Sequence, residues 1–371
     1  MDECLWFATC QLLASQAAIQ ERHDVMNPFH LSLILIVLAG LFQGTFGLGM
    51  KRFAPLSWEG FWIVFTILGM VLIPIGCSAI VIPDPWTAIR AVPAGDLATS
   101  ILLGGSWGVG ALMFGLAINR IGLSLAYGIT MSVAAAMGSL IPLMSMAGAG
   151  SNPAVPWVIA SIIVMVLGVV TLTWAGVLRD RIQTTAGQPV LGISRGRGFY
   201  MGLLFAILNG LGAALLNVGF TRAQPAAQAA ISQGVPARNA SLVAWVIVLL
   251  GGCLVNLAYA LYLLIKNRSY YTFASSGASK GLIWAIVTAV LWFAALAVYG
   301  QGAAIMGRLG PVIGWSLFLG LSLVVSSILG LKDREWAGMK GPVRILLTGD
   351  AVIVASAIML GYANYLTMVH Q

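Results

Sequence analysis

Residues 31–49 read LSLILIVLAGLFQGTFGLG, a run of 19 residues without a charged side chain. A helix needs about 20 mostly apolar residues to cross the hydrocarbon core of a bilayer. The run does not alternate apolar and polar residues, as a strand of a membrane β-barrel would. It therefore predicts a membrane-spanning helix.

Runs of the same kind recur along the chain, so we expect an all-α integral membrane protein with ten transmembrane helices. Their predicted positions are 31–49, 60–82, 97–118, 123–146, 155–177, 198–220, 240–265, 281–301, 311–330 and 343–366.

The composition of the 371 residues agrees with this interpretation: 60% are hydrophobic, 8% are charged, and the mean hydropathy is +0.96. A soluble domain carries roughly 25% charged residues. Too few polar residues remain here to cover a soluble fold. A soluble enzyme, a nucleic-acid-binding domain and a disordered protein are therefore excluded, and the lipid bilayer is the expected surrounding.

Three glycines are spaced along one face of the first predicted span. Gly40 and Gly44 are four residues apart, and Gly47 follows three residues later. Small residues at this spacing let two membrane helices approach closely. We expect these glycines to form a helix-packing face.

The ten spans divide into two halves. Residues 178–197 are the most polar internal connection, so we expect a first five-helix half at 26–177, a cytoplasmic linker at 178–197 and a second five-helix half at 198–371. An odd number of spans in each half inserts the second half upside down. Such inverted repeats are typical of secondary transporters. Residues 1–25 are interpreted as an N-terminal extension, either disordered or a misassigned start, because Met26 directly precedes the first apolar run.

Basic residues fall unevenly on the two sides of these ten spans. Fourteen Lys and Arg lie on one side and five on the other. Short cytoplasmic loops carry the excess of Lys and Arg. The prediction is that the side with 14 faces the cytoplasm and that both termini lie outside.

Two acidic residues are candidates for proton coupling. Asp350 lies about seven residues inside the last predicted span, where an ionisable group is a functional candidate. The alternative interpretation is that Asp350 reaches the cytoplasmic interface or pairs with Arg344. Glu59 begins the second span, either as an acid favoured by the helix dipole or as a cytoplasmic gate paired with Lys51 or Arg52.

Amide and aromatic side chains in the spans are candidates for a substrate cavity. Amides donate and accept hydrogen bonds, which suits a hydroxyl-rich ligand. The candidates are Trp107, Asn209, Gln43, Tyr127, Asn217, Asn256, Trp292 and Gln301, with Trp107 and Asn209 favoured because they lie mid-span. The alternatives are interhelical hydrogen bonds for the amides and interfacial belt positions for the aromatics. The belt position is favoured for Tyr299 and Trp315, near predicted helix ends.

The sequence contains no catalytic constellation, no metal-ligand spacing and no phosphate-binding loop. Its three histidines lie at or outside the ends of the predicted membrane region. We expect no enzyme activity, no metal and no organic cofactor.

Short motifs spread over residues 40–366 combine Trp, Gly and charged residues near helix ends. They are Lys51-Arg52, Ser57-Trp58-Glu59 with Trp62, Trp107-Gly108-Val109-Gly110, Thr173-Trp174-Ala175-Gly176 and Lys332-Asp333-Arg334-Glu335-Trp336. Together they resemble the L-rhamnose–proton symporter family, within the drug/metabolite transporter superfamily.

The resemblance implies a drug/metabolite transporter-like fold in a bacterial cytoplasmic membrane. It also implies uptake of a small sugar, with L-rhamnose expected, and a proton as the coupling ion. One alternative is an exporter of amino acids or other small metabolites from the same superfamily. Another, from a different class, is a non-transporting membrane scaffold.

Overall fold

The computed structural model describes residues 28–50, 52–146, 148, 150, 152–185 and 196–369. All regular structure in these ranges is helical. Ten helices are long and apolar enough to span a membrane, which confirms the predicted number. They cover Pro28–Met50, Trp58–Val81, Ala94–Ile121, Leu123–Ser145, Val155–Thr185, Arg197–Ser232, Ala237–Lys266, Ala278–Ile305, Gly307–Lys332 and Lys340–Val369.

Several spans consist of more than one helical element. The first comprises α2 (Pro28–Thr45) and α3 (Gly47–Met50), and the sixth comprises α10 (Arg197–Arg222) and α11 (Gln224–Ser232). The seventh adds the short α12 (Ala237–Ala240) before α13 (Leu242–Lys266). Five further spans are single long helices: α7 (Ala94–Ile121), α8 (Leu123–Ser145), α9 (Val155–Thr185), α14 (Ala278–Ile305) and α16 (Lys340–Val369). The ninth span is α15 (Gly310–Lys332), preceded by the 3-10 turn η4 (Gly307–Leu309).

The second span contains a wide turn. It runs as α4 (Trp58–Ile67), a π-helical segment η1 (Leu68–Leu72) and α5 (Ile73–Val81). Pro74 follows this segment and cannot donate a backbone hydrogen bond, and its ring displaces the carbonyl four residues before it. The backbone accommodates the proline by widening from an α turn to a π turn.

The first part of the predicted linker 178–197 is helical. Helix α9 continues to Thr185, so 178–185 are helical, and α10 starts at Arg197. Polar residues at a helix end extend past the membrane without ending the helix, which hydropathy alone does not show. The rest of that linker, 186–195, and the predicted extension at 1–25 lie outside the described residues.

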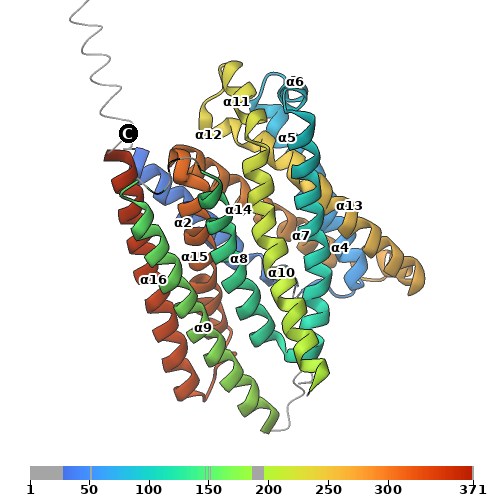
Figure 1. Ribbon diagram of the computed structural model, residues 1–371. Coiled ribbons are helices and arrows are strands. Elements are labelled where there is room, and N and C mark those ends of the chain that lie inside the picture. Colours follow the sequence, from blue (N-terminus) through green and yellow to red (C-terminus); the bar gives the residue numbers. More distant parts are fainter. Residues whose placement is uncertain are drawn as a thin grey trace, which may run out of the picture.

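The long helices form one bundle (Figure 1). α9 and α16 pack along each other at one side, and α7, α10 and α13 pack together toward the other. α2, α8, α14 and α15 fill the region between these groups. On the end opposite the last turn of α9, Gln233 exchanges two hydrogen bonds with the backbone of Asp84, each 3.0 Å long, and so joins α11 to the start of α6 (Pro85–Arg90).

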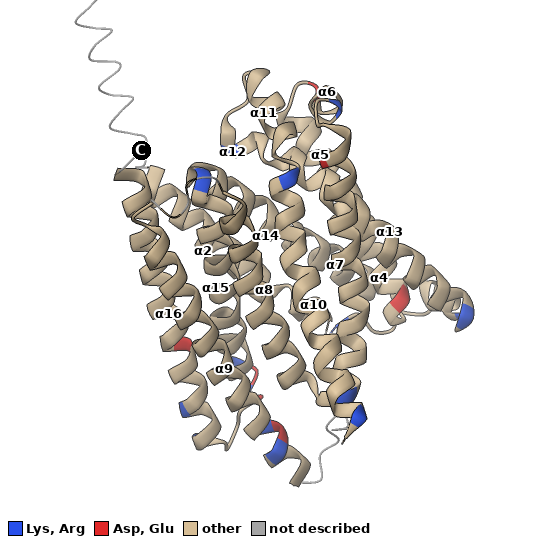
Figure 2. Cartoon of the chain, in the orientation of Figure 1, with Lys and Arg blue, Asp and Glu red and all other residues tan. Residues whose placement is uncertain are grey.

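Charged residues gather at the ends of the bundle (Figure 2). Of the 16 Lys and Arg that the structure describes, 12 flank helix ends on the side where α9 ends and α16 begins. The other four, on the opposite side, are Arg90, Arg222, Arg238 and Arg308. The uneven distribution predicted from the sequence is therefore present in the folded bundle.

The glycine face of α2 is shorter than predicted. A Cβ built on Gly40 would lie 2.8 Å from Leu321 Cβ of α15, and one on Gly44 would lie 2.6 Å from Val325 Cβ. A Cβ on Gly47 meets no described atom within 4 Å. The inclusion of Gly47 is thus wrong, because α2 ends at Thr45 and Gly47 starts the separate helix α3.

Gly44→Ala is expected to lower the free energy of unfolding by about 1–3 kcal/mol, since an added methyl group overpacks the contact between α2 and α15. Gly47→Ala is the matched control and should leave stability unchanged or slightly raised. Thermal unfolding of both variants in mild detergent measures the difference. Equal stability of the two variants would contradict the close contact between α2 and α15 at Gly44.

Candidate functional site

Asp350 is a buried carboxylate in the membrane-spanning part of α16. Only 8% of the residue is exposed. It hydrogen-bonds Ser327 of α15, and its Oδ1 has no hydrogen-bond partner among the described residues. Among the described residues, Asp350 does not form the alternative ion pair with Arg344. An ionisable side chain therefore faces a neighbouring helix inside the bundle without a countercharge.

Helix α16 starts at Lys340, before the apolar span that is predicted to begin at residue 343. Asp350 lies seven residues into that span, about 10 Å along the helix axis. The hydrocarbon core is about 30 Å thick. A short aspartate side chain at that depth does not reach the interface as a lysine or arginine does.

Glu59 joins the start of α4 to the connection that follows α13. It is 6% exposed, and it accepts hydrogen bonds from the Asn267 amide at 3.1 Å and from the Ser269 hydroxyl. The alternative pairing of Glu59 with Arg52 is not formed in this structure, where the Arg52 guanidinium lies 4.8 Å from the centre of the Trp284 ring. Lys51 lies outside the described residues.

Five aromatic rings contact one another in a continuous series, partly stacked and partly tilted or edge-to-face, which we call the aromatic ladder. In it, consecutive ring centroids are 4.8–5.5 Å apart. The ladder runs from the first turn of α4 to the middle of α7 and α14, in the order Trp58, Trp62, Phe65, Trp292 and Trp107. Two of these rings, Trp107 and Trp292, were predicted cavity residues, and the structure brings them together.

An amide lies beside the ladder. Trp62 Nε1 donates to Asn256 Oδ1 at 2.9 Å, and the Asn256 amide nitrogen donates to the Gly252 carbonyl at 2.8 Å. Trp58, Trp62 and Phe65 were not among the predicted cavity residues. Their spacing of four and three residues on one helix face was the signal that could have found them.

A cavity of about 580 Å³ lies at the end of the bundle opposite the 12 basic residues, among the ends of α8, α10, α11, α14 and α15. We call it the outer cavity. Its polar lining includes Thr221, Arg222, Gln224, Gln228 and Arg308. None of the predicted cavity residues lines it.

A hydrogen-bond network lies directly beneath the outer cavity, next to the lining residues Phe220 and Pro311. The Tyr299 hydroxyl donates to Asn217 Oδ1 at 2.6 Å. The Asn217 amide nitrogen donates to the carbonyls of Gly138, at 2.9 Å, and Pro311, at 3.0 Å. One side chain therefore connects α8, α10, α14 and α15.

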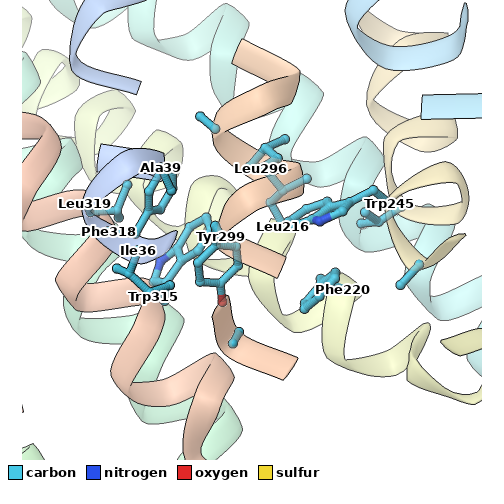
Figure 3. Packing of buried hydrophobic residues seen from close by; sticks show 14 of the residues in the cluster. Ile36, Ala39, Leu216, Phe220, Trp245, Leu296, Tyr299, Trp315, Phe318 and Leu319 are labelled. Carbon is cyan, nitrogen blue, oxygen red and sulfur yellow. The ribbon is translucent and has the colours of Figure 1, made fainter. Parts of the chain in front are cut away.

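The belt positions predicted for Tyr299 and Trp315 are wrong. Tyr299 is 0% exposed and Trp315 is 3% exposed. Figure 3 shows Tyr299 between Trp315 and Phe220 in the packed interior. Trp315 Nε1 donates to the Ala134 carbonyl at 2.9 Å. Both rings lie near helix ends, yet neighbouring helices cover them.

The remaining predicted cavity residues lie apart from one another. The Asn209 amide donates to Thr130 Oγ1 of α8 at 3.1 Å, an interhelical hydrogen bond. Gln301 reaches Asn239 Oδ1 at 3.4 Å. The Tyr127 ring packs beside Phe114, with centroids 6.2 Å apart, and Gln43 Oε1 is buried without a hydrogen-bond partner in the described chain.

No group of three or more His, Cys, Asp or Glu in the described residues is placed to hold a metal ion. The chemistry that this arrangement offers is binding of a polar ligand between aromatic rings and amides, with one carboxylate available to hold a proton.

Comparison with known proteins gives a consistent result. A family model described as L-rhamnose-proton symport protein matches residues 25–365. An L-rhamnose-proton symporter of Klebsiella pneumoniae subsp. pneumoniae is 28% identical over 350 residues, covering 92% of this chain and 98% of the relative. Proteins of the same name from Cronobacter sakazakii and Pectobacterium atrosepticum are each 26% identical, covering 90% of this chain and 98% of the relative.

Proposed function

This chain belongs to the L-rhamnose-proton symport protein family, and we propose that it is a secondary transporter that takes up L-rhamnose together with protons. The observation that carries the proposal is the match over residues 25–365, which includes almost all of the ten membrane-spanning helices. The relatives that match over 90% or more of this chain are named as symporters, not as enzymes. An exporter of other metabolites and a non-transporting scaffold are not favoured by this match.

Uptake of radiolabelled L-rhamnose into proteoliposomes tests the proposal. An inward proton gradient should raise the accumulated sugar well above the level reached without the gradient, and collapse of the gradient by a protonophore should remove the increase. Equal accumulation of L-rhamnose with and without the gradient would reject proton coupling. Absence of L-rhamnose uptake by folded protein would reject the substrate.

The aromatic ladder and Asn256 support a sugar site in the middle of the bundle. The less polar face of a sugar ring packs on aromatic faces, and its hydroxyl groups pair with amides. Trp58, Trp62 and Trp107 are partly exposed, so their faces are not fully used by protein contacts. The sugar in this proposal lies against Trp107, near the bilayer midplane, as in other secondary transporters.

Trp107→Leu is expected to raise the L-rhamnose concentration that half-saturates uptake by about tenfold, equal to about 1.4 kcal/mol of binding free energy. The reason is the loss of a ring face that contacts the sugar. Trp157→Leu is the matched control, since Trp157 is 43% exposed on α9, far along the sequence from the ladder. Equal effects of the two substitutions would contradict the location of the site.

Asp350 is our candidate for the proton-binding group. Protonation removes the charge from a carboxylate that has no countercharge in the described bundle, and a neutral carboxyl group costs much less to bury. The proton enters from outside with the sugar and leaves to the cytoplasm. Each cycle then moves one positive charge inward with a neutral sugar.

The helix contacts support two inverted five-helix repeats and the drug/metabolite transporter fold. Several pairs of packed helices have a counterpart in which each span is replaced by the span five places earlier or later in the chain. The pair α7 and α10 corresponds to α14 and α2, the pair α8 and α10 to α15 and α2, and the pair α8 and α9 to α15 and α16. The glycine contacts show the same correspondence between the halves. Gly44 of α2 packs against Val325 of α15, and Gly210 of α10 packs against Val133 of α8. Rocking of two such halves about a central site gives alternating access.

The charge distribution supports an inner-membrane location with both termini outside and the 12 described basic residues facing the cytoplasm. In a variant without native cysteines, a membrane-impermeant thiol reagent should label Gln228→Cys in intact cells. Thr184→Cys, near the end of α9, should be labelled only in inverted vesicles. The reverse pattern would reject this orientation.

A further inference from the structure

A second cavity, of about 520 Å³, lies on the side of the bundle near the ends that carry the 12 basic residues. We call it the lateral groove. Its floor is α8, which packs closely against both α9 and α10, whereas α9 and α10 do not pack closely against each other over their described residues. The groove therefore opens between α9 and α10, in the wall of the bundle.

The walls of the lateral groove are mostly apolar. They include Leu125, Ile129 and Val133 of α8, Val170 and Trp174 of α9, and Phe199 of α10. Val170 is 55% exposed and Trp174 is 52% exposed. All three helices span the membrane, so these surfaces face the hydrocarbon region of the bilayer and not water. Apolar surface of this kind is matched by an acyl chain.

The mouth of the groove carries positive charge from the α9 wall. Arg181 of α9 lines the groove, is exposed, and has no ion-pair partner among the described residues. The neighbouring acid Asp180 is bound by Arg179 at 3.2 Å, so it does not neutralise Arg181. Arg197, the first residue of α10, is also exposed but does not line the groove.

We infer that the lateral groove binds an anionic phospholipid, with one acyl chain between α9 and α10 and the phosphate at Arg181. The apolar walls fit the chain, and Arg181 complements the negative phosphate, since arginine donates in a fork that suits phosphate oxygens. Basic pockets between membrane helices recognise anionic head groups in this way. The volume of about 520 Å³ lies within the range of small-molecule sites, about 300–1,000 Å³.

The lipid site does not depend on the identity of the transported sugar. The groove lies between α9, the last span of the first half, and α10, the first span of the second half. A bound lipid there would stabilise the packing of the two halves at the point where the chain passes between them.

Native mass spectrometry of the full-length protein in mild detergent tests the inference, because it counts bound lipids without a transport assay. The protein is titrated with phosphatidylglycerol and, separately, with zwitterionic phosphatidylcholine. We expect one phosphatidylglycerol molecule to be retained at least fivefold more than phosphatidylcholine. Arg181→Gln should remove this preference, and Val177→Trp, which adds a bulky side chain to the lining of the groove, should reduce retention of both lipids.

Arg344→Gln is the matched control, because Arg344 is an exposed arginine on the same side of the bundle that does not line the groove. It should leave the lipid preference unchanged. Equal retention of the two lipids by the unsubstituted protein would overturn the inference, as would an equal loss in the Arg344 variant. A dimer that forms without lipid and is lost in Val177→Trp would make a second copy of the chain the occupant and would also overturn it.

Discussion

Asp350→Asn is expected to reduce proton-driven accumulation of L-rhamnose in proteoliposomes to the level measured without a gradient. The substitution preserves the size of the side chain and its hydrogen bond with Ser327 but removes the ability to gain and lose a proton. Exchange of labelled for unlabelled sugar with no gradient should persist, because that partial reaction needs the sugar site and not net proton transfer. The uptake and exchange assays are run on the same preparation.

Asp96→Asn is the control for this prediction. Asp96 is an acid on α7 that forms a solvent-exposed pair with Arg222 at 3.5 Å, and exposed pairs contribute about 0–1 kcal/mol to stability. Its replacement should leave both assays unchanged. Gradient-driven accumulation that survives in the Asp350 variant would assign the coupling proton to another group while leaving the transport function intact.

Asn217→Leu is expected to lower the free energy of unfolding by about 2–4 kcal/mol. Interhelical hydrogen bonds in membrane proteins contribute about 0.6 kcal/mol each and up to about 1.7 kcal/mol, and a buried polar group left without a partner costs about 1–3 kcal/mol. Leucine has a similar volume, but it leaves the Tyr299 hydroxyl without its short acceptor at 2.6 Å and the carbonyls of Gly138 and Pro311 without their amide donor. Denaturant titration in mild detergent measures the loss.

Tyr299→Phe separates the hydrogen bond from the packing of the ring. It removes one donor and keeps the contacts with Trp315 and Phe318, so it should cost about 1 kcal/mol. If the leucine variant is no less stable than the phenylalanine variant, Asn217 does not connect the four helices as the structure indicates.

The number of spans, their approximate positions and the uneven distribution of basic residues could be predicted from the sequence. Each is a local property: a bilayer requires about 20 apolar residues in succession, and such runs are visible without knowing what lies beside them. The linker boundary was less predictable, because the polar last turns of α9 extend the helix beyond the apolar run.

The partners of the polar and aromatic residues were decided by the tertiary structure alone. Tyr299 meets Asn217 across 82 positions of sequence, and Trp62 meets Asn256 across 194. In a soluble helix the apolar face identifies the side that packs inward. In a membrane helix the lipid tails are as apolar as the protein interior, so hydropathy marks the span but not its rotation. The sequence by itself therefore determined a ten-helix membrane protein with one basic end. Only the packing of the helices decided that Trp107 and Trp292 stack in the interior while Trp174 faces outward, because that choice depends on how each helix turns toward its neighbours.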